Sequence, residues 1–305
     1  MSAKTVASKA RSSSFDLALL LTLSILWGAS YVLIRIGVAT IPPLTLMGAR
    51  TLIAGALLAA WIVTRGIPVP RDARLWARFL VQALLNSVVP FTLIAWAEQS
   101  VEAGLATILN SASPVLAFVA TWLITRHERV TWRKLLGVIA GLAGICLIIG
   151  TSAFGDLGNQ FIPQLAIVAA TVCYAGAAIY GRSFDGLPPA VPAAGSLLLG
   201  AALLVPASLF FDEPWTIHPS AASLAALLAL AVLSTALAFV IYFRLVQTLG
   251  SVTTTAQAYL RVPIGVALGV VFLGEPLTPT AWIGLVCVVT GVAAMTIRQA
   301  APPTR

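Results

Sequence analysis

The feature that most limits the possible folds of this chain is a set of ten apolar runs of about 20 residues, each long enough to cross a bilayer. Backbone amides in hydrocarbon must be bonded within their own segment, so such runs fold as helices. Only 9% of the 305 residues are charged and 59% are hydrophobic, unlike a soluble domain. The sequence therefore predicts an all-α integral membrane protein. We expect its ten transmembrane helices at residues 17–39, 44–64, 77–97, 103–125, 133–151, 162–182, 192–211, 221–243, 252–273 and 279–297.

Short loops rich in Gly and Pro separate these runs, and none is long enough for a separate domain. The first run exceeds the core of a cleaved signal peptide, so we expect it to remain as the first span. The predicted organisation is a cytoplasmic N-terminal tail at 1–16, a first five-helix repeat at 17–151, a second five-helix inverted repeat at 162–297 and a cytoplasmic tail at 298–305.

The basic residues predict the orientation of these spans. All but three of the 18 Lys and Arg fall on one side of the predicted topology. Positive charge marks the cytoplasmic side, so both termini are expected in the cytoplasm. The bases sit in short gaps rather than in a stripe with aromatics, so no nucleic-acid partner is expected; the partners are the lipid bilayer and a small-molecule substrate. The opposite loops contain Glu98, Glu102, Asp156, Asp212, Glu213 and Glu275.

The chain also matches itself at a shift of about 147 residues. This shift places Trp27 on Tyr174 and Gly144 on Gly291, and a further two-residue gap places Pro114 on Pro263. Five is an odd number of spans, so the second copy must enter the membrane from the opposite face. Such inverted repeats are typical of secondary transporters, which bind cargo near the midplane between the two halves.

At residues 26–30, Leu-Trp-Gly-Ala-Ser, and at Pro43 with Arg50, the chain resembles the EamA-type transporters of the drug/metabolite transporter superfamily. Pro114 with Glu128, echoed as Pro263 with Glu275, extends the likeness, which points to the bacterial aromatic amino-acid exporters of the YddG group. The second copy departs from the pattern at 173–175, Cys-Tyr-Ala. The resemblance implies amino-acid export across the bacterial cytoplasmic (inner) membrane.

Polar residues at helical spacing predict which faces avoid lipid. The third span carries Gln82 and Asn86 one turn apart, and the fourth carries Asn110. The alternative is that these side chains join helices through hydrogen bonds worth about 0.6 to 2 kcal/mol each. The candidate substrate-binding residues are Trp27, Tyr31, Gln82, Asn86, Asn110, Tyr174, Ser234, Gln257, Tyr259 and Arg261.

Proline and glycine have separate predicted roles. Pro114 and Pro263 occupy matched positions and are candidate hinges, because proline frees a backbone carbonyl within a helix. Five glycines of the fifth and tenth spans are expected to allow close helix packing instead. They are Gly137, Gly141, Gly144, Gly284 and Gly291.

Arg261 lies about ten residues into a span, and no span carries a carboxylate at its middle. A buried arginine needs a partner, which is either a substrate carboxylate or carbonyls freed near Pro263. Arg35, Arg50 and Glu98 lie near outer helix ends, where structural pairing is expected. Proton-driven carriers usually keep an acid within the membrane, so ordinary proton coupling through a midspan carboxylate is not expected.

An enzyme would need a nucleophile, a base or a metal cluster on one side of the membrane. His127 and His218 lie on opposite predicted sides, and the three cysteines have no zinc or redox spacing, so no catalytic residue, metal site or cofactor is expected. A channel would fit ten spans, but the inverted repeat favours a carrier. The open alternatives for cargo are drugs or other metabolites and, further off, nucleotide sugars.

Overall fold

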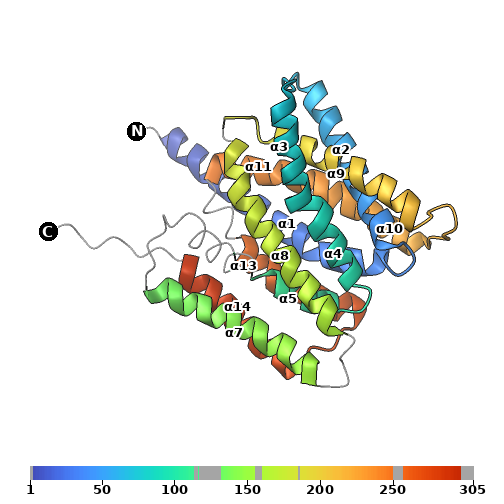
Figure 1. The fold of residues 1–305 in the computed structure, drawn as a ribbon. Coiled ribbons are helices and arrows are strands. Elements are labelled where there is room, and N and C mark those ends of the chain that lie inside the picture. The colour runs from blue at the N-terminus through green and yellow to red at the C-terminus, as the bar shows by residue number, and fades with distance from the viewer. Residues whose placement is uncertain are drawn as a thin grey trace.

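The computed structural model describes residues 3–112, 116, 132–154, 160–184, 186–249 and 257–296. Within these residues every regular element is a helix, and the helices form one bundle (Figure 1). The first half contains α1 (Ala3–Gly37), α2 (Pro43–Thr64), α3 (Ala73–Ala83), η1 (Leu84–Val88), α4 (Val89–Ala97), α5 (Ala103–Asn110) and α7 (Trp132–Phe154). The second half contains α8 (Phe161–Gly181), η3 (Arg182–Phe184), α9 (Ala190–Phe211), α10 (Ala221–Ala231), η4 (Val232–Leu237), α11 (Ala238–Leu249), α13 (Gln257–Leu273) and α14 (Pro279–Thr296).

These helices coincide with the expected spans. By length and composition, five described helices could cross a membrane: Phe15–Gly37, Pro43–Thr64, Ala73–Ala97, Ala190–Phe211 and Ala221–Tyr242. Shorter apolar helices occupy four more expected spans, at Leu135–Gly144, Phe161–Ala177, Leu260–Leu273 and Pro279–Gly291. The fourth span is described as α5, and most of its remainder lies outside the described residues. The predicted ten-span architecture is confirmed.

The first helix begins earlier than the sequence pattern predicts. α1 starts at Ala3, whereas the apolar run starts near Leu17. The residues before that run include no Pro or Gly, and the Ala, Lys and Arg among them are good helix formers. The helix therefore extends on the N-terminal side of the apolar segment. Residue 17 is therefore where the apolar part of α1 begins, and it is not the first residue of the helix.

Lateral packing follows the internal repeat. The second and seventh spans are repeat mates, and α2 packs along α9; the fifth and tenth are also mates, and α7 packs along α14. Figure 1 shows α7 and α14 side by side at one edge of the bundle. α1 packs on α13 and on the eighth span, while α8 packs on α4 and α5. The two halves therefore interlock through pairs of equivalent elements.

The glycine contacts between α7 and α14 show the two-fold character of this arrangement. A Cβ atom on Gly144 would lie 2.9 Å from the Gly284 carbonyl oxygen, and one on Gly291 would lie 2.6 Å from the Gly137 carbonyl oxygen. Gly144 corresponds to Gly291 and Gly137 to Gly284 at the 147-residue shift, so the two contacts are reciprocal, as in an isologous interface. The predicted packing role of these glycines is confirmed.

A second matched feature is a π-helical segment in the middle of the third and eighth spans. η1 contains Ser87 and η4 contains Ser234, which are 147 residues apart. π-Helical segments are rare and occur often at functional sites, because the wider turn redirects side chains. The two segments occupy equivalent positions in the two repeats, and each carries a serine.

Gly291→Ala should destabilise the protein, because the new methyl group would meet backbone atoms of α7 that cannot rotate away. Overpacking of this kind costs about 1 to 3 kcal/mol. Thermal denaturation of the detergent-solubilised protein, followed by its monodisperse fraction, should show a lower midpoint. Gly176→Ala on α8 is the matched control, because its nearest neighbour is a Leu85 side-chain carbon at 3.7 Å. Equal stability of both variants would contradict the close-packing role.

Candidate functional site

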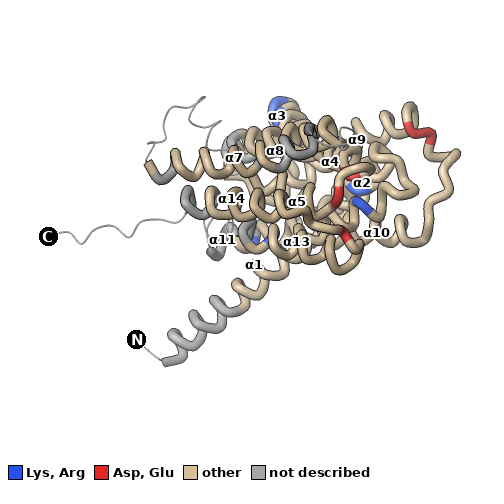
Figure 2. Tube along the Cα trace, turned by 90° about the horizontal axis from the view of Figure 1, so that it is seen from below, with Lys and Arg blue, Asp and Glu red and all other residues tan. Residues whose placement is uncertain are grey.

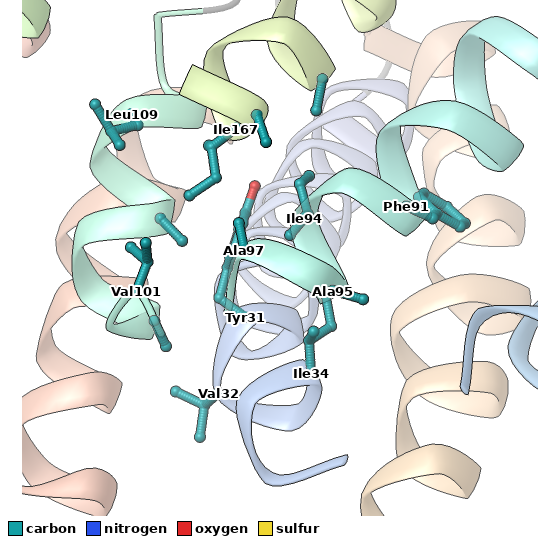
Figure 3. Close-up of a cluster of buried hydrophobic side chains, with 14 of the residues drawn as sticks. Tyr31, Val32, Ile34, Phe91, Ile94, Ala95, Ala97, Val101, Leu109 and Ile167 are labelled. Atoms are coloured by element: carbon teal, nitrogen blue, oxygen red, sulfur yellow. The ribbon is translucent and has the colours of Figure 1, made fainter. Parts of the chain in front are cut away.

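A hydrogen-bonded chain of polar side chains joins three helices inside the bundle. The Asn110 amide of α5 donates to the Tyr31 hydroxyl of α1, and the Thr171 hydroxyl of α8 lies 3.0 Å from the Asn110 side-chain oxygen. All three side chains are buried. Figure 3 shows the Tyr31 side chain among apolar neighbours, including Ile94 and Ile167. The surrounding apolar packing fixes the position of these polar groups.

Arg50 on α2 is a charged side chain inside the bundle, with an exposure of 6%. Its Nε donates to the Thr235 hydroxyl over 2.9 Å, and its guanidinium lies 3.9 Å from the centre of the Phe91 ring. The Thr235 hydroxyl is in turn 2.8 Å from the Leu230 carbonyl oxygen, across the π-helical turn of η4. Among the described residues no carboxylate forms an ion pair with Arg50, and its structural partners are the Thr235 hydroxyl and the Phe91 ring.

Arg261 on α13 lies in the same region. Its Nε is buried and has no hydrogen-bond partner within the described part of the chain. Arg261 and Arg50 both interact electrostatically with the hydroxyls of Tyr31 and Tyr174. The Arg261 carbonyl packs so closely on α1 that a Cβ atom on Gly28 would lie 3.1 Å from it. Two cations and two phenols are therefore held together by α1, α2, α8 and α13.

The two π-helical segments add hydroxyls without partners. Ser87 is fully buried and Ser234 is 1% exposed, and neither hydroxyl has a hydrogen-bond partner in the described residues. Ser234 precedes Thr235, the residue bonded to Arg50. Ser87 faces small residues, with its Cβ 3.6 Å from the position of a Cβ on Gly200. A buried hydroxyl without a partner lowers stability, so these two serines are candidates for a role other than packing.

Two acids form hydrogen bonds with the first residues of two helices, α2 and α5. Asp212, which follows α9, accepts hydrogen bonds from the backbone amide and hydroxyl of Thr45 at 2.7 and 2.9 Å. Glu275, in the loop before α14, accepts from the backbone amides of Ala103 and Gly104 at 2.7 and 2.8 Å. Carboxylates stabilise a helix start because they satisfy its free amides and complement its dipole. Both acids therefore have structural partners.

Glu98 differs from these two acids. It follows the last residue of α4 and is fully buried, yet neither carboxyl oxygen has a hydrogen-bond partner among the described residues. Arg35 donates instead to the Glu98 backbone carbonyl, so the expected pairing with Arg35 exists but does not involve the carboxyl group. Figure 2 shows basic and acidic segments close together near α2 and α5.

Burial strongly affects the ionisation of this carboxyl group. Removal from water raises the pKa of Glu98 well above its usual range, because burial disfavours the charged form. The nearby Glu275 also raises the pKa, whereas Arg35 and Arg50 lower it. A buried carboxyl group with a raised pKa therefore lies near two arginines at this end of the site.

The structure brings four of the predicted binding residues together: Tyr31, Asn110, Tyr174 and Arg261. Trp27 packs instead against the rings of Tyr242 and Phe239 on α11, at centroid distances of 5.6 and 6.4 Å. Gln82 and Asn86 are half-buried on the third span, and no described contact connects them to the four residues.

Some predicted residues cannot be placed as side chains. The side chains of Gln257 and Tyr259 and the whole of Pro114 lie outside the described residues. Pro263 is exposed, and α13 continues through it, so Pro263 does not divide the span into two half-helices. Its hinge role stays a prediction.

Sequence reasoning did not include Arg50 or Glu98 among the candidate binding residues. Arg50 lies two turns into α2, and its depth could have been read from the start of the span at Pro43. Glu98 carried no such signal, because its position at the end of a helix suggested exposure to water. Its burial depends on neighbouring segments that are distant in the sequence.

The comparisons with known proteins agree with this architecture. The chain matches the EamA-like transporter family at residues 15–150 and again at 162–297, once for each repeat. It is 30% identical over 281 residues to the uncharacterized inner membrane transporter YedA of Escherichia coli (strain K12), covering 91% of this chain and 89% of the relative. It is also 30% identical over 286 residues to the uncharacterized transporter YvbV of Bacillus subtilis (strain 168), covering 93% and 92%.

A solved crystal structure aligns with 93% of this chain and 97% of its own, with a TM-score of 0.65 at 21% identity, which supports the fold. The names of the two relatives specify transport but no cargo, so the likeness to aromatic amino-acid exporters stays a prediction. Both repeats match, and together they span most of the sequence. The chain therefore belongs to the EamA-like transporter family.

Proposed function

We propose that this membrane transporter carries small organic metabolites out of the cell, and that its cargo is amino acids of the aromatic or neutral class. The observation that carries the proposal is the interior cluster of Tyr31, Asn110, Tyr174, Arg50 and Arg261, of which Tyr174 and Arg261 are half-buried and the others buried. Guanidinium groups are suited to a carboxylate, and phenol and amide groups supply hydrogen bonds and ring contacts. An amino acid with an uncharged side chain presents complementary groups.

Alternating access is the proposed mechanism. Two five-helix repeats related by inversion can rock about a cargo site at their interface, so that it opens to one side at a time. The residues of the cluster come from both repeats: α1, α2 and α5 belong to the first, and α8 and α13 to the second. Relative movement of the repeats would therefore change the contacts around the cargo.

We also propose that the protein lies in the bacterial inner membrane with both termini in the cytoplasm. Exposed arginines gather before and within the first turns of α3, at Arg65, Arg71 and Arg74. The loops at the other ends of the spans contain acids, including Asp212 and Glu275. This distribution fits the excess of positive charge found in cytoplasmic loops.

Counterflow in liposomes tests the proposed cargo. Liposomes containing the purified protein are loaded with one unlabelled solute, and uptake of the labelled solute is measured without a pH gradient. Aromatic and neutral L-amino acids should exchange with saturation and stereospecificity. Exchange of varied hydrophobic drugs but not of amino acids would contradict the proposed cargo, and flux that is neither saturable nor stereospecific would indicate a channel.

Arg261→Gln should weaken the transport of solutes that have a free carboxylate. Loss of a hydrogen bond to a charged group costs about 1.5 to 3 kcal/mol, which corresponds to a rise in KM of about ten- to hundred-fold. The matching amino-acid amides, which lack the negative charge, should change little. Arg65→Gln, in an exposed loop, is the control. Equal effects on acids and amides would show that Arg261 does not recognise the carboxylate.

A further inference from the structure

We propose that the Glu98 carboxyl group is an exchange site, which binds either a proton or the ammonium group of the cargo, each excluding the other. This inference rests on the proposed function, because it assumes a cargo with an amino group. The expectation drawn from the sequence concerned a carboxylate at the middle of a span, whereas Glu98 follows the last residue of α4.

The first argument is the missing partner of a fully buried acid. Both Glu98 oxygens are inaccessible to water and lack hydrogen-bond partners in the described residues. An isolated carboxylate in such surroundings is costly, so it must be neutralised by a proton or by a cation. No basic side chain among the described residues forms an ion pair with these oxygens, which fits the protonated state.

The second argument is the contrast with the neighbouring acids. Asp212 and Glu275 use their carboxylates to hold the starts of α2 and α5, so their positions are explained by structure. Glu98 holds no helix start, and Arg35 fixes it only through its backbone carbonyl. The residue is therefore held in place while its carboxyl group stays available.

The third argument is the charge distribution around Glu98. Arg35 and Tyr31 approach from α1, Arg50 from α2 and Glu275 from the loop before α14, while Glu102 precedes α5 and is half-buried. The arginines can bind the carboxylate of an amino acid. Glu98, when ionised, has the charge that can bind its ammonium group. The cluster thus offers opposite charges to the two ends of a zwitterion.

Mutually exclusive binding at one group couples two fluxes. A proton taken up by Glu98 releases the ammonium group, and a bound ammonium group requires the proton to have left. By linkage, the proton lowers the affinity for cargo and cargo lowers the affinity for the proton by the same factor. In a carrier that alternates between the two sides, this exchange lets inward proton movement drive export.

The test compares an amino acid with its deamino analogue, which keeps the carboxylate and side chain but lacks the ammonium group. In the wild-type protein, KM for the amino acid should rise by up to about ten-fold for each unit of falling pH once Glu98 is protonated. KM for the analogue should not follow this dependence. Liposomes with an interior one pH unit more acidic should accumulate the amino acid about ten-fold, for one proton per solute.

Glu98→Gln should abolish both the pH dependence of KM and the accumulation, and it should raise KM for the amino acid while leaving KM for the deamino analogue nearly unchanged. Glu102→Gln is the matched control, because it removes a half-buried acid four residues away, and it should behave as the wild type. The same pH dependence for the amino acid and its analogue, or proton-driven accumulation by Glu98→Gln, would overturn the proposal.

Failure of this inference can be separated from failure of the proposed function. Counterflow of amino acids without proton-driven accumulation supports the proposed function and contradicts exchange at Glu98. If no amino acid shows counterflow, the proposed function fails, and infrared spectroscopy still tests Glu98. The wild-type protein should then show a protonated carboxyl band at neutral pH that is absent from Glu98→Gln; a wild-type spectrum without this band would contradict the proposal.

Discussion

The cost of an unpaired polar group in hydrocarbon is the constraint on which this structure depends. It requires the backbone to form helices across the bilayer, and it directs the few polar side chains into the interior of the bundle. The hydrogen-bonded chain of Tyr31, Asn110 and Thr171 follows from this requirement. Against that background, Glu98, Ser87, Ser234 and Arg261 each carry a buried polar atom that has no hydrogen-bond partner among the described residues.

The two repeats have equivalent helix packing but differ in the positions of their charged residues. The equivalent features include the reciprocal glycine contacts of α7 with α14 and the matched π-helical segments η1 and η4. Arg50 of the first repeat corresponds to Leu197 in the second, and Arg261 of the second corresponds to Ala112 in the first. Under the proposed function, an approximately symmetric scaffold would allow two alternate openings, and the asymmetric charges would favour one cargo orientation.

Much of this architecture could be predicted from the sequence, because bilayer thickness and helix geometry fix span lengths. The repeat also predicted the packing glycines, since equivalent spans meet at equivalent positions. Glu98 could not be interpreted correctly in this way. Its burial arises from segments far apart in the chain, and the position of a residue at the end of a helix does not reveal what covers it. The packing of the Trp27 ring on α11 could not be predicted from the sequence either, and its role in binding stays a prediction.

The central claim is that the interior cluster faces each side of the membrane in turn. A single cysteine at Ser87, which is fully buried in the described conformation, tests this claim directly when the native cysteines are replaced. Its reaction with an impermeant maleimide is measured in intact cells and in inverted vesicles. Alternating access predicts reaction from both sides, with cargo changing the two rates in opposite directions. Reaction from one side only, unaffected by cargo, would contradict the account.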